Sequence, residues 1–134
     1  MTSALENLAG PGRPLAAEPP DDNEIAGLLR SGKPRLADAR NTTLSPESRF
    51  DLACNAAHAV CLAALRRHRY RARHRYIVFQ TLPHTLGLGP EVWRVLVKTH
   101  DLRNLVQDEG HVDVEERLVQ DAIHACDLVV AALA

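Results

Sequence analysis

The chain has 134 residues, with 16 lysines and arginines against 17 aspartates and glutamates and a formal net charge of -1 at pH 7. This length supports one domain with a real core and is too short for two ordinary ones, and the near-neutral total argues against a protein that coats nucleic acid with uniform positive charge. Aromatic residues make up only 4% of the chain while alanine and leucine dominate its apolar fraction, which favours closely packed helices over a β-sandwich.

The N-terminal region is predicted to be a tail. Residues 10–20, GPGRPLAAEPP, hold four of the eight prolines of the chain and show no periodic apolar face. We therefore expect residues 1–20 to form a flexible N-terminal tail and residues 21–134 to form a single domain. The first ten residues lack the basic start and apolar run of a signal peptide, and no stretch has the apolar length of a membrane span, so we expect a cytoplasmic protein with no membrane partner.

Two short helical segments are expected before the main helices. The stretch DDNEIAGLLRSG at residues 21–32 has an acidic start, which favours a helix N-terminus, and it ends at a glycine. A second short segment is expected around residues 36–40. A long helix is then predicted at residues 46–69, because Ser45 is a good N-cap and Pro46 suits the first helical position.

The helix predicted at residues 46–69 has apolar or small residues on two sides. One side carries the residues that recur at helical spacing, which are Phe50, Ala53, Cys54, Ala57, Val60, Cys61, Ala64 and Leu65. The second side carries Ala56, Ala59 and Ala63, whose small side chains allow a neighbouring backbone to approach closely.

Three further helices are expected. The first spans residues 73–82 and ends before Pro83, because proline continues a helix only at high cost. The next spans residues 90–109 and carries a continuous apolar stripe. The last begins at Asp113, and Glu116 three residues later gives a capping-box-like start. No convincing strand is found, so the predicted fold is all-α, an antiparallel up-and-down bundle of four main helices with short N-terminal helices.

Cys54, His58 and Cys61 fall at i, i+4 and i+7 on one face of a predicted helix, where they resemble part of a metal-ligand set. A structural zinc site needs a fourth ligand and usually a paired spacing such as C-x2-C, which the sequence lacks. We interpret this face as core with reduced, buried thiols and predict no metal. The sequence also lacks a glycine-rich phosphate loop and a nucleophile elbow, so no cofactor is predicted.

The most basic stretch of the sequence, RRHRYRARHR, places six arginines and two histidines within residues 66–75. The six are Arg66, Arg67, Arg69, Arg71, Arg73 and Arg75. Cations near a helix C-terminus interact favourably with the helix dipole, which explains the first three without any ligand. The last three lie where the next helix is expected to start, so the dipole does not favour them there. With Tyr70 and Tyr76 available for stacking, nucleic-acid binding and a solvated basic face both stay open.

The helix predicted at residues 90–109 carries polar residues beside its apolar stripe. His100, Arg103 and Gln107 follow one another at i, i+3 and i+7, with Asn104 adjacent. The simplest interpretation is the polar border of an amphipathic helix. An arginine against a core-facing seam also suits a carboxylate, a phosphate or a partner subunit, because its guanidinium presents several donors in one plane.

Three segments together resemble the higher-eukaryote and prokaryote nucleotide-binding (HEPN) domain family. They are SPESRFDLACNAAHAVCLAAL, HRYR and RYIVFQTLPHTLGLGPEVWRVLVKTHDLRNLVQDEG, and the resemblance, which is to a bacterial subgroup, covers about residues 45–133. It implies that residues 21–134 form a HEPN-like helical bundle of a kind that often forms a homodimer. Many members are metal-independent ribonucleases, and these are frequently toxins paired with a nucleotidyltransferase antitoxin.

The resemblance places the site around Arg103 and Asn104. These residues match the opening of the family's motif, an arginine and a polar residue followed a few positions later by a histidine. Asp108 stands where the shortest spacing would place that histidine, and an ionised aspartate is a poor acid that repels phosphate. The candidate substitutes are His100, one helical turn before the arginine, and His111 just beyond the helix.

Two functions are expected from the resemblance. The first is a ribonuclease-like domain whose catalytic candidates are Arg103, Asn104, Asp108 and His100, with RNA also contacting the arginines of residues 66–75. The second is a non-catalytic dimeric module that binds a nucleotide or a protein in a toxin-antitoxin-type system, where Arg103 pairs with a carboxylate such as Asp108.

Overall fold

A computed structural model describes residues 4–109 and 113–134, with the side chains of residues 106–109 outside that description. In chain order its elements are α1 (Ala4–Asn7), β1 (Leu15–Ala17), α2 (Asp22–Ala39), α3 (Pro46–Arg67), β2 (Tyr70–Ala72), α4 (Arg75–Gln80), α5 (Leu82–Thr85), α6 (Pro90–Glu109) and α7 (Glu116–Leu133).

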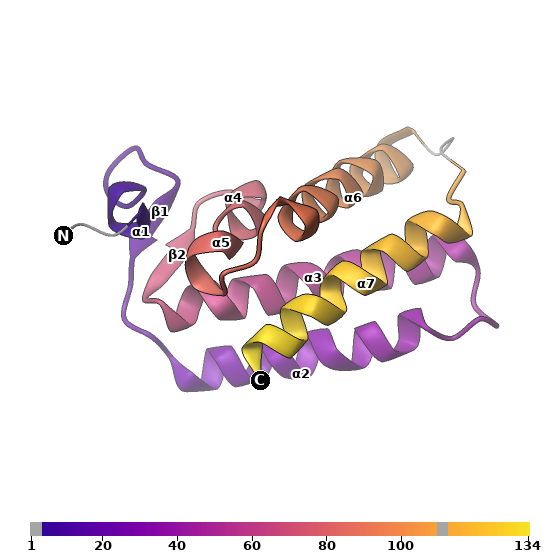
Figure 1. Ribbon diagram of the computed structural model, residues 1–134, viewed down its shortest axis with the longest axis horizontal. Helices are drawn as coiled ribbons and strands as arrows, with labels where there is room; N and C mark the ends of the chain where they lie inside the picture. Colours follow the sequence, from indigo (N-terminus) through magenta and orange to yellow (C-terminus); the bar gives the residue numbers. More distant parts are fainter. Residues whose placement is uncertain (1–3, 110–112) are drawn as a thin grey trace.

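The four long helices α2, α3, α6 and α7 form the bundle, and each runs opposite to the long helix before it (Figure 1). The predicted all-α up-and-down bundle is therefore confirmed. Helix α3 lies at its centre, with α2 along one side, α6 along another and α7 packed across both α3 and α6. Across the described residues, no helix combines enough length with enough apolar character to cross a membrane.

Helix α2 corrects the prediction of two short segments, because it runs unbroken through Pro34 for 18 residues. The Asp21 side chain accepts hydrogen bonds from the first-turn N–H groups and caps the helix. A proline inside a helix costs about 3 kcal/mol. Burial of Ile25, Leu36 and neighbouring residues on one side of the helix offsets that cost, an effect of tertiary packing that the local sequence does not reveal.

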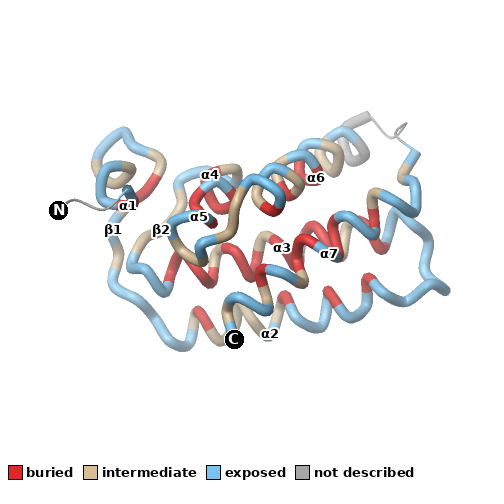
Figure 2. Tube along the Cα trace, in the orientation of Figure 1, coloured by how far each residue is buried: buried red, intermediate tan, exposed pale blue. Residues whose placement is uncertain are grey.

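Helix α3 starts as predicted, because the Ser45 hydroxyl accepts a hydrogen bond from the Ser48 N–H at 3.2 Å and Pro46 follows the cap. Its second small-residue side is also confirmed. Ala56, Ala59 and Ala63 are all buried, and Gly32 of α2 lies directly against this surface. Buried residues follow α3 along its length, whereas the outer side of α2 is exposed (Figure 2).

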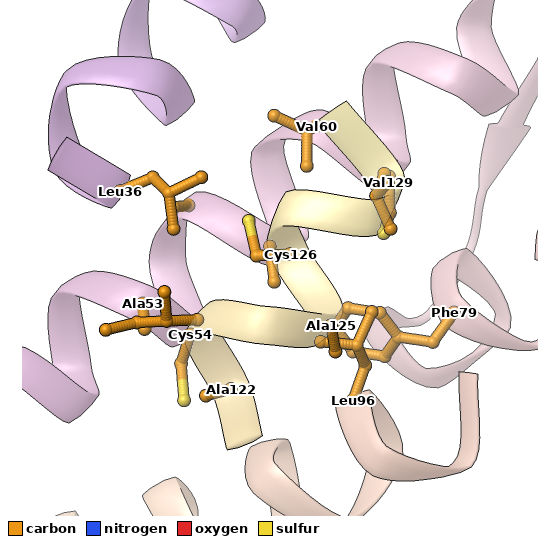
Figure 3. Packing of buried hydrophobic residues seen from close by; sticks show 14 of the residues in the cluster. Leu36, Ala53, Cys54, Val60, Phe79, Leu96, Ala122, Ala125, Cys126 and Val129 are labelled. Carbon is orange, nitrogen blue, oxygen red and sulfur yellow. The ribbon is translucent and has the colours of Figure 1, made fainter. Parts of the chain in front are cut away.

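The core gathers small and branched side chains from α2, α3, α4, α6 and α7 (Figure 3). Cys54, Cys61 and Cys126 are free and buried within it, which confirms the prediction of reduced, buried thiols for the first two. Burial raises the pKa of Cys54 to about 12 and that of Cys126 to about 12. These thiols are therefore protonated and unreactive near neutral pH.

The segment predicted as a flexible tail has its own structure from residue 4 onward. Strand β1 pairs antiparallel with β2, so that Leu15 lies opposite Ala72. Leu5 and Leu15 pack on Leu65 and Ile77 in a second, smaller apolar cluster. The sequence did not predict this pairing. Each strand pairs through only three residues, and such short strands carry no alternating apolar pattern.

Two later helix boundaries also differ from the prediction. The helix expected at residues 73–82 is two short helices, α4 and α5, separated at Thr81, whose hydroxyl donates to the Ile77 carbonyl at 2.9 Å. Pro83 lies inside the first turn of α5 instead of ending a helix. Helix α7 begins at Glu116 and not at Asp113, because the intrahelical bonds start at the carbonyl of Glu115.

Candidate functional site

Arg103 lies where α3 and α6 meet. Its Nε donates to Oδ1 of Asp51 at 2.8 Å, and the Asn55 side-chain amide donates to the other oxygen of the same carboxylate at 3.2 Å. The Arg103 side chain is 14% exposed. The bond to Asp51 uses Nε. The two terminal Nη atoms have no hydrogen-bond partner within the described part of the chain. The guanidinium is thus oriented by α3, and its two terminal groups are unpaired among the described side chains.

Asn104 lies next to Tyr76 of α4. The Tyr76 hydroxyl donates to Oδ1 of Asp101 at 2.6 Å, and this bond raises the pKa of Tyr76. The Asn104 side chain lies close enough to the same hydroxyl to lower that pKa. The structure therefore joins the polar residues of α6 to α4, a contact that sequence spacing did not predict.

His100, proposed from the sequence as a catalytic substitute, is buried and 4% exposed. Its ring lies edge-on to Tyr76 at 5.2 Å between ring centroids and tilted to Phe79 at 5.8 Å. Burial lowers the pKa of His100, and Arg75 and Arg103 lower it further. An imidazole enclosed in this way packs the α4–α6 contact and does not reach a ligand on the surface.

His58 of α3 is less buried than His100 and was missed as a site residue. It is half-buried on α3, two turns after Asp51, and its ring lies edge-on to Phe79 with 6.2 Å between the ring centroids. Burial lowers the pKa of His58 to about 4, with further lowering by Arg75, His100 and Arg103. The signal that could have found it is the polar row Asp51, Asn55 and His58 at i, i+4 and i+7, because these positions share one side of a helix.

The remaining candidates of the motif are not placed by the structure. Asp108 and Gln107 belong to α6, but their side chains lie outside the described residues. His111 also lies outside them. Among the described side chains Arg103 pairs with Asp51, and its pairing with Asp108 stays a prediction.

Arg66 and Arg71 are committed to ion pairs inside the molecule. The Arg66 side chain is 1% exposed and pairs with Glu24 of α2 and with Glu18, and it also donates to the Pro19 carbonyl at 2.7 Å. Arg71 bonds to the same two carboxylates, at 2.7 Å to Glu18 and 2.6 Å to Glu24. Two of the six arginines therefore fix the segment before α2 to the bundle.

The other four arginines are exposed. Arg67 donates to the Leu133 carbonyl at 3.0 Å, and Arg73 reaches the Gly10 carbonyl at 3.5 Å. The side chains of Arg69 and Arg75 have no hydrogen bond or ion pair within residues 4–105 and 113–134. The positive charge that stays available is therefore carried by Arg67, Arg69, Arg73 and Arg75.

Comparison of the chain with protein-family models, with curated proteins and with solved structures gives no match. Within the described residues, no group of three histidine, cysteine, aspartate or glutamate side chains could hold a metal ion.

The low pKa of His58 predicts pH-dependent stability. In the unfolded chain His58 binds a proton below its ordinary pKa of 6.5, whereas the folded residue stays neutral down to about pH 4. The free energy of unfolding therefore decreases as the pH is lowered from 6.5 to about 4. We expect a loss on the order of 2 kcal/mol, since each pKa unit corresponds to about 1.4 kcal/mol and the group is only half-buried. Urea denaturation at several pH values should show that the free energy of unfolding depends less on pH in His58→Gln than in the wild type. The same pH dependence in both proteins would contradict the low pKa of His58.

Proposed function

We propose that this chain is a HEPN-like domain that binds an RNA phosphate at Arg103 and Asn104, with a site derived from that of metal-independent toxin ribonucleases. One observation carries the proposal. Arg103 is oriented through Nε by Asp51, and its two Nη atoms have no hydrogen-bond partner within the described part of the chain. Two N–H groups in one plane suit two phosphate oxygens, and such charge-assisted bonds are the strong ones.

The surrounding charge supports an anionic ligand. Arg75 acts electrostatically on both His58 and His100, as Arg103 does, so positive charge from α4 and α6 converges on one region of α3. The carboxylate of Asp51 is already bonded to Arg103 and Asn55, and that of Asp101 accepts from Tyr76. A phosphate would balance the positive charge of Arg75 and Arg103, and the two neutral histidines add no further positive charge.

Cleavage would need a proton acceptor for the RNA 2'-hydroxyl and a proton donor for the leaving 5'-oxygen. Arg103 would stabilise the extra negative charge on the phosphorane between these two steps. His100 is enclosed, so it does not fill either role in the described structure. The proposal therefore assigns Arg103 to phosphate binding and charge stabilisation, while Asn104 orients the ligand beside Tyr76.

A homodimer is part of the proposal. Leu105 follows the Arg103–Asn104 pair on α6 and is 42% exposed, so it would give a second copy an apolar contact beside the site. A second copy packed there would bring two Arg103 side chains toward one groove. We also propose a nucleotidyltransferase antitoxin as the partner that would cover this groove.

The second candidate is the non-catalytic dimeric module. It is favoured by the Arg103–Asp51 ion pair and by the burial of His100, since both observations give these side chains a packing role. In that case Arg103→Ala would change dimer stability, measured by sedimentation equilibrium, and RNA binding would be absent at any salt concentration. A phosphate-binding site would instead show affinity that falls steeply with added salt.

The proposal is tested by incubating the protein with end-labelled mixed RNA in the presence of EDTA. We expect the labelled RNA to be bound, and this binding to weaken about tenfold or more in Arg103→Ala, because charge-assisted bonds to a phosphate are lost. Any cleavage should be lost with the binding. Arg94→Ala is the matched control, because Arg94 lies on the same helix and stacks on Trp93 at 5.4 Å. Wild-type protein that is folded but neither cleaves nor binds RNA would contradict the proposal.

A further inference from the structure

A cavity of about 380 Å³ lies where the end of α2 and the start of α3 meet α7 (Figure 1). Its floor is formed by two buried residues, Arg49 of α3 and Ile123 of α7. The rest of its lining is more exposed and comes from Arg40, Thr42, Gln120, His124 and Asp127. The cavity is separate from the Arg103–Asn104 pair, neither of which lines it.

Arg49 places a fixed donor at the floor of the cavity. Its side chain is 4% exposed, its Nε donates to the Ala39 carbonyl at 2.8 Å, and its Nη1 donates to the two oxygens of Glu116 at 2.9 and 2.7 Å. Its Nη2 has no hydrogen-bond partner within the described part of the chain. Among the described side chains, the polar atom that is fully enclosed without a partner is Oγ1 of Thr85, so Nη2 of Arg49 is open to the cavity. A guanidinium held at Nε and Nη1 keeps this remaining donor in one direction, which suits a carboxylate oxygen.

Helix α7 contributes oxygen acceptors to the same cavity. Arg40 bonds to Oδ1 of Asp127, and Oδ2 has no hydrogen-bond partner among the described residues. The side chains of this pair are 47% and 43% exposed, so the pair contributes little to stability and Asp127 can also accept from a ligand. The amide nitrogen of Gln120 donates to Glu116 at 2.9 Å, which leaves its carbonyl oxygen as a second acceptor.

The charges at the cavity favour a ligand with no net charge. The two arginines, Arg40 and Arg49, are matched by the carboxylates of Asp127 and Glu116. A phosphate would bring more than one negative charge next to Asp127, and a simple amine would be repelled by the two arginines. A ligand with one carboxylate and one ammonium group satisfies the donors and the acceptors together. Ile123 adds an apolar surface, and the volume lies within the range of about 300–1,000 Å³ that is usual for small-molecule sites.

We propose that this cavity binds a free α-amino acid with an apolar side chain. The carboxylate of the ligand accepts from Nη2 of Arg49, and its ammonium group donates to Asp127 and to the carbonyl oxygen of Gln120. The apolar side chain of the ligand packs on Ile123. The end of a peptide carries only one of the two charged groups, so the free amino acid is the ligand that fits. The site does not rest on the proposed function, because Arg103 and Asn104 do not line it.

The test is a titration of the protein with L-leucine, L-methionine and L-valine, followed by amide NMR. At least one of them should shift the backbone signals of Ile123 and His124 and leave those of Arg103 and Asn104 unchanged. Analogues that lack one charged group, which for leucine are isocaproate and isoamylamine, should bind about tenfold or more weakly, because charge-assisted hydrogen bonds are lost. No shift with any of the three amino acids would overturn the site. Equally tight binding of isocaproate or of inorganic phosphate would overturn it as well, since either result would show a simple anion site.

A variant of Asp127 separates the ammonium contact from the carboxylate contact. Asp127→Asn should weaken binding of the amino acid about tenfold or more and should not weaken binding of isocaproate, which has no ammonium group. The matched control is Asp121→Asn, which removes an exposed carboxylate of the same helix outside the cavity and should bind both ligands within about twofold of wild type. Equal weakening in the two variants would show an effect of net charge and would overturn the site. RNA binding by Asp127→Asn should match that of wild type, so failure of this site and failure of the proposed function are distinguishable.

Discussion

Replacing Arg66 with alanine is expected to lower the free energy of unfolding by about 3 kcal/mol, because the partners of a buried cation would be left without it. The guanidinium bonds to Glu24 and Glu18 and donates to the carbonyls of Glu18, Pro19 and Tyr70. Removal of one partner of a buried ion pair costs about 3–5 kcal/mol. The side chains of Glu24 and Glu18 are 31% and 42% exposed, so water relieves part of the cost and the lower end applies.

The neighbouring Arg67 provides the control. Its side chain is exposed and makes one hydrogen bond, to the Leu133 carbonyl. Arg67→Ala should therefore change the free energy of unfolding by about 0.5 kcal/mol or less. If Arg66→Ala does not fold, Arg66→Met with Glu24→Gln removes both charges and should recover part of the stability. Equal effects of the two alanine substitutions in urea denaturation would show that Arg66 is not the structural cation.

The roles of the arginines in residues 66–75 could not be predicted from the local sequence. Its composition could not separate structural from solvated cations, because Arg66 and Arg67 are adjacent and chemically identical. Their roles differ through residues more than 40 positions away, since Glu18 and Glu24 reach Arg66 whereas Arg67 turns to the chain end. Glu24 reaches Arg66 because α2 packs along α3, and Glu18 does so because it directly follows β1, which pairs with β2.

The candidate site was predictable only in part. Arg103 and Asn104 lie beside the apolar stripe of α6 and were proposed as a site from the family resemblance, and the structure places both at the contact with α3 and α4. His100 lies one turn before Arg103 on the same side of α6, but its side chain is buried. The spacing along the helix does not predict this difference in burial. His58 was interpreted only as part of a cysteine face, because its relation to Arg75 comes from packing between separate helices.

The close contact between α2 and α3 gives the second large effect, at Gly32. A Cβ atom at this position would lie 2.9 Å from Cγ1 of Val60 and 3.2 Å from the carbonyl oxygen of Ala56. The carbonyl belongs to the backbone of α3 and cannot move independently of that helix. The predicted small-residue surface of α3 therefore allows close approach only because its partner position in α2 also lacks a side chain.

We expect Gly32→Ala to lower the free energy of unfolding by about 1–2 kcal/mol, since overpacking costs about 1–3 kcal/mol and the gain in helix propensity returns a part. Gly32→Val adds two methyl groups at the same place and should cost about 3 kcal/mol or more.

Gly27 of the same helix is the matched control for this contact. A Cβ there meets only the end of the Arg30 side chain, at 3.7 Å, which is ordinary van der Waals contact. Gly27→Ala should therefore stabilise the protein by about 0.5–1 kcal/mol, because alanine loses less backbone entropy on folding. Urea denaturation of the two alanine variants should give changes of opposite sign. Stabilisation by both would mean that α2 can move away from α3 at no cost, and that the α2–α3 contact is not closely packed.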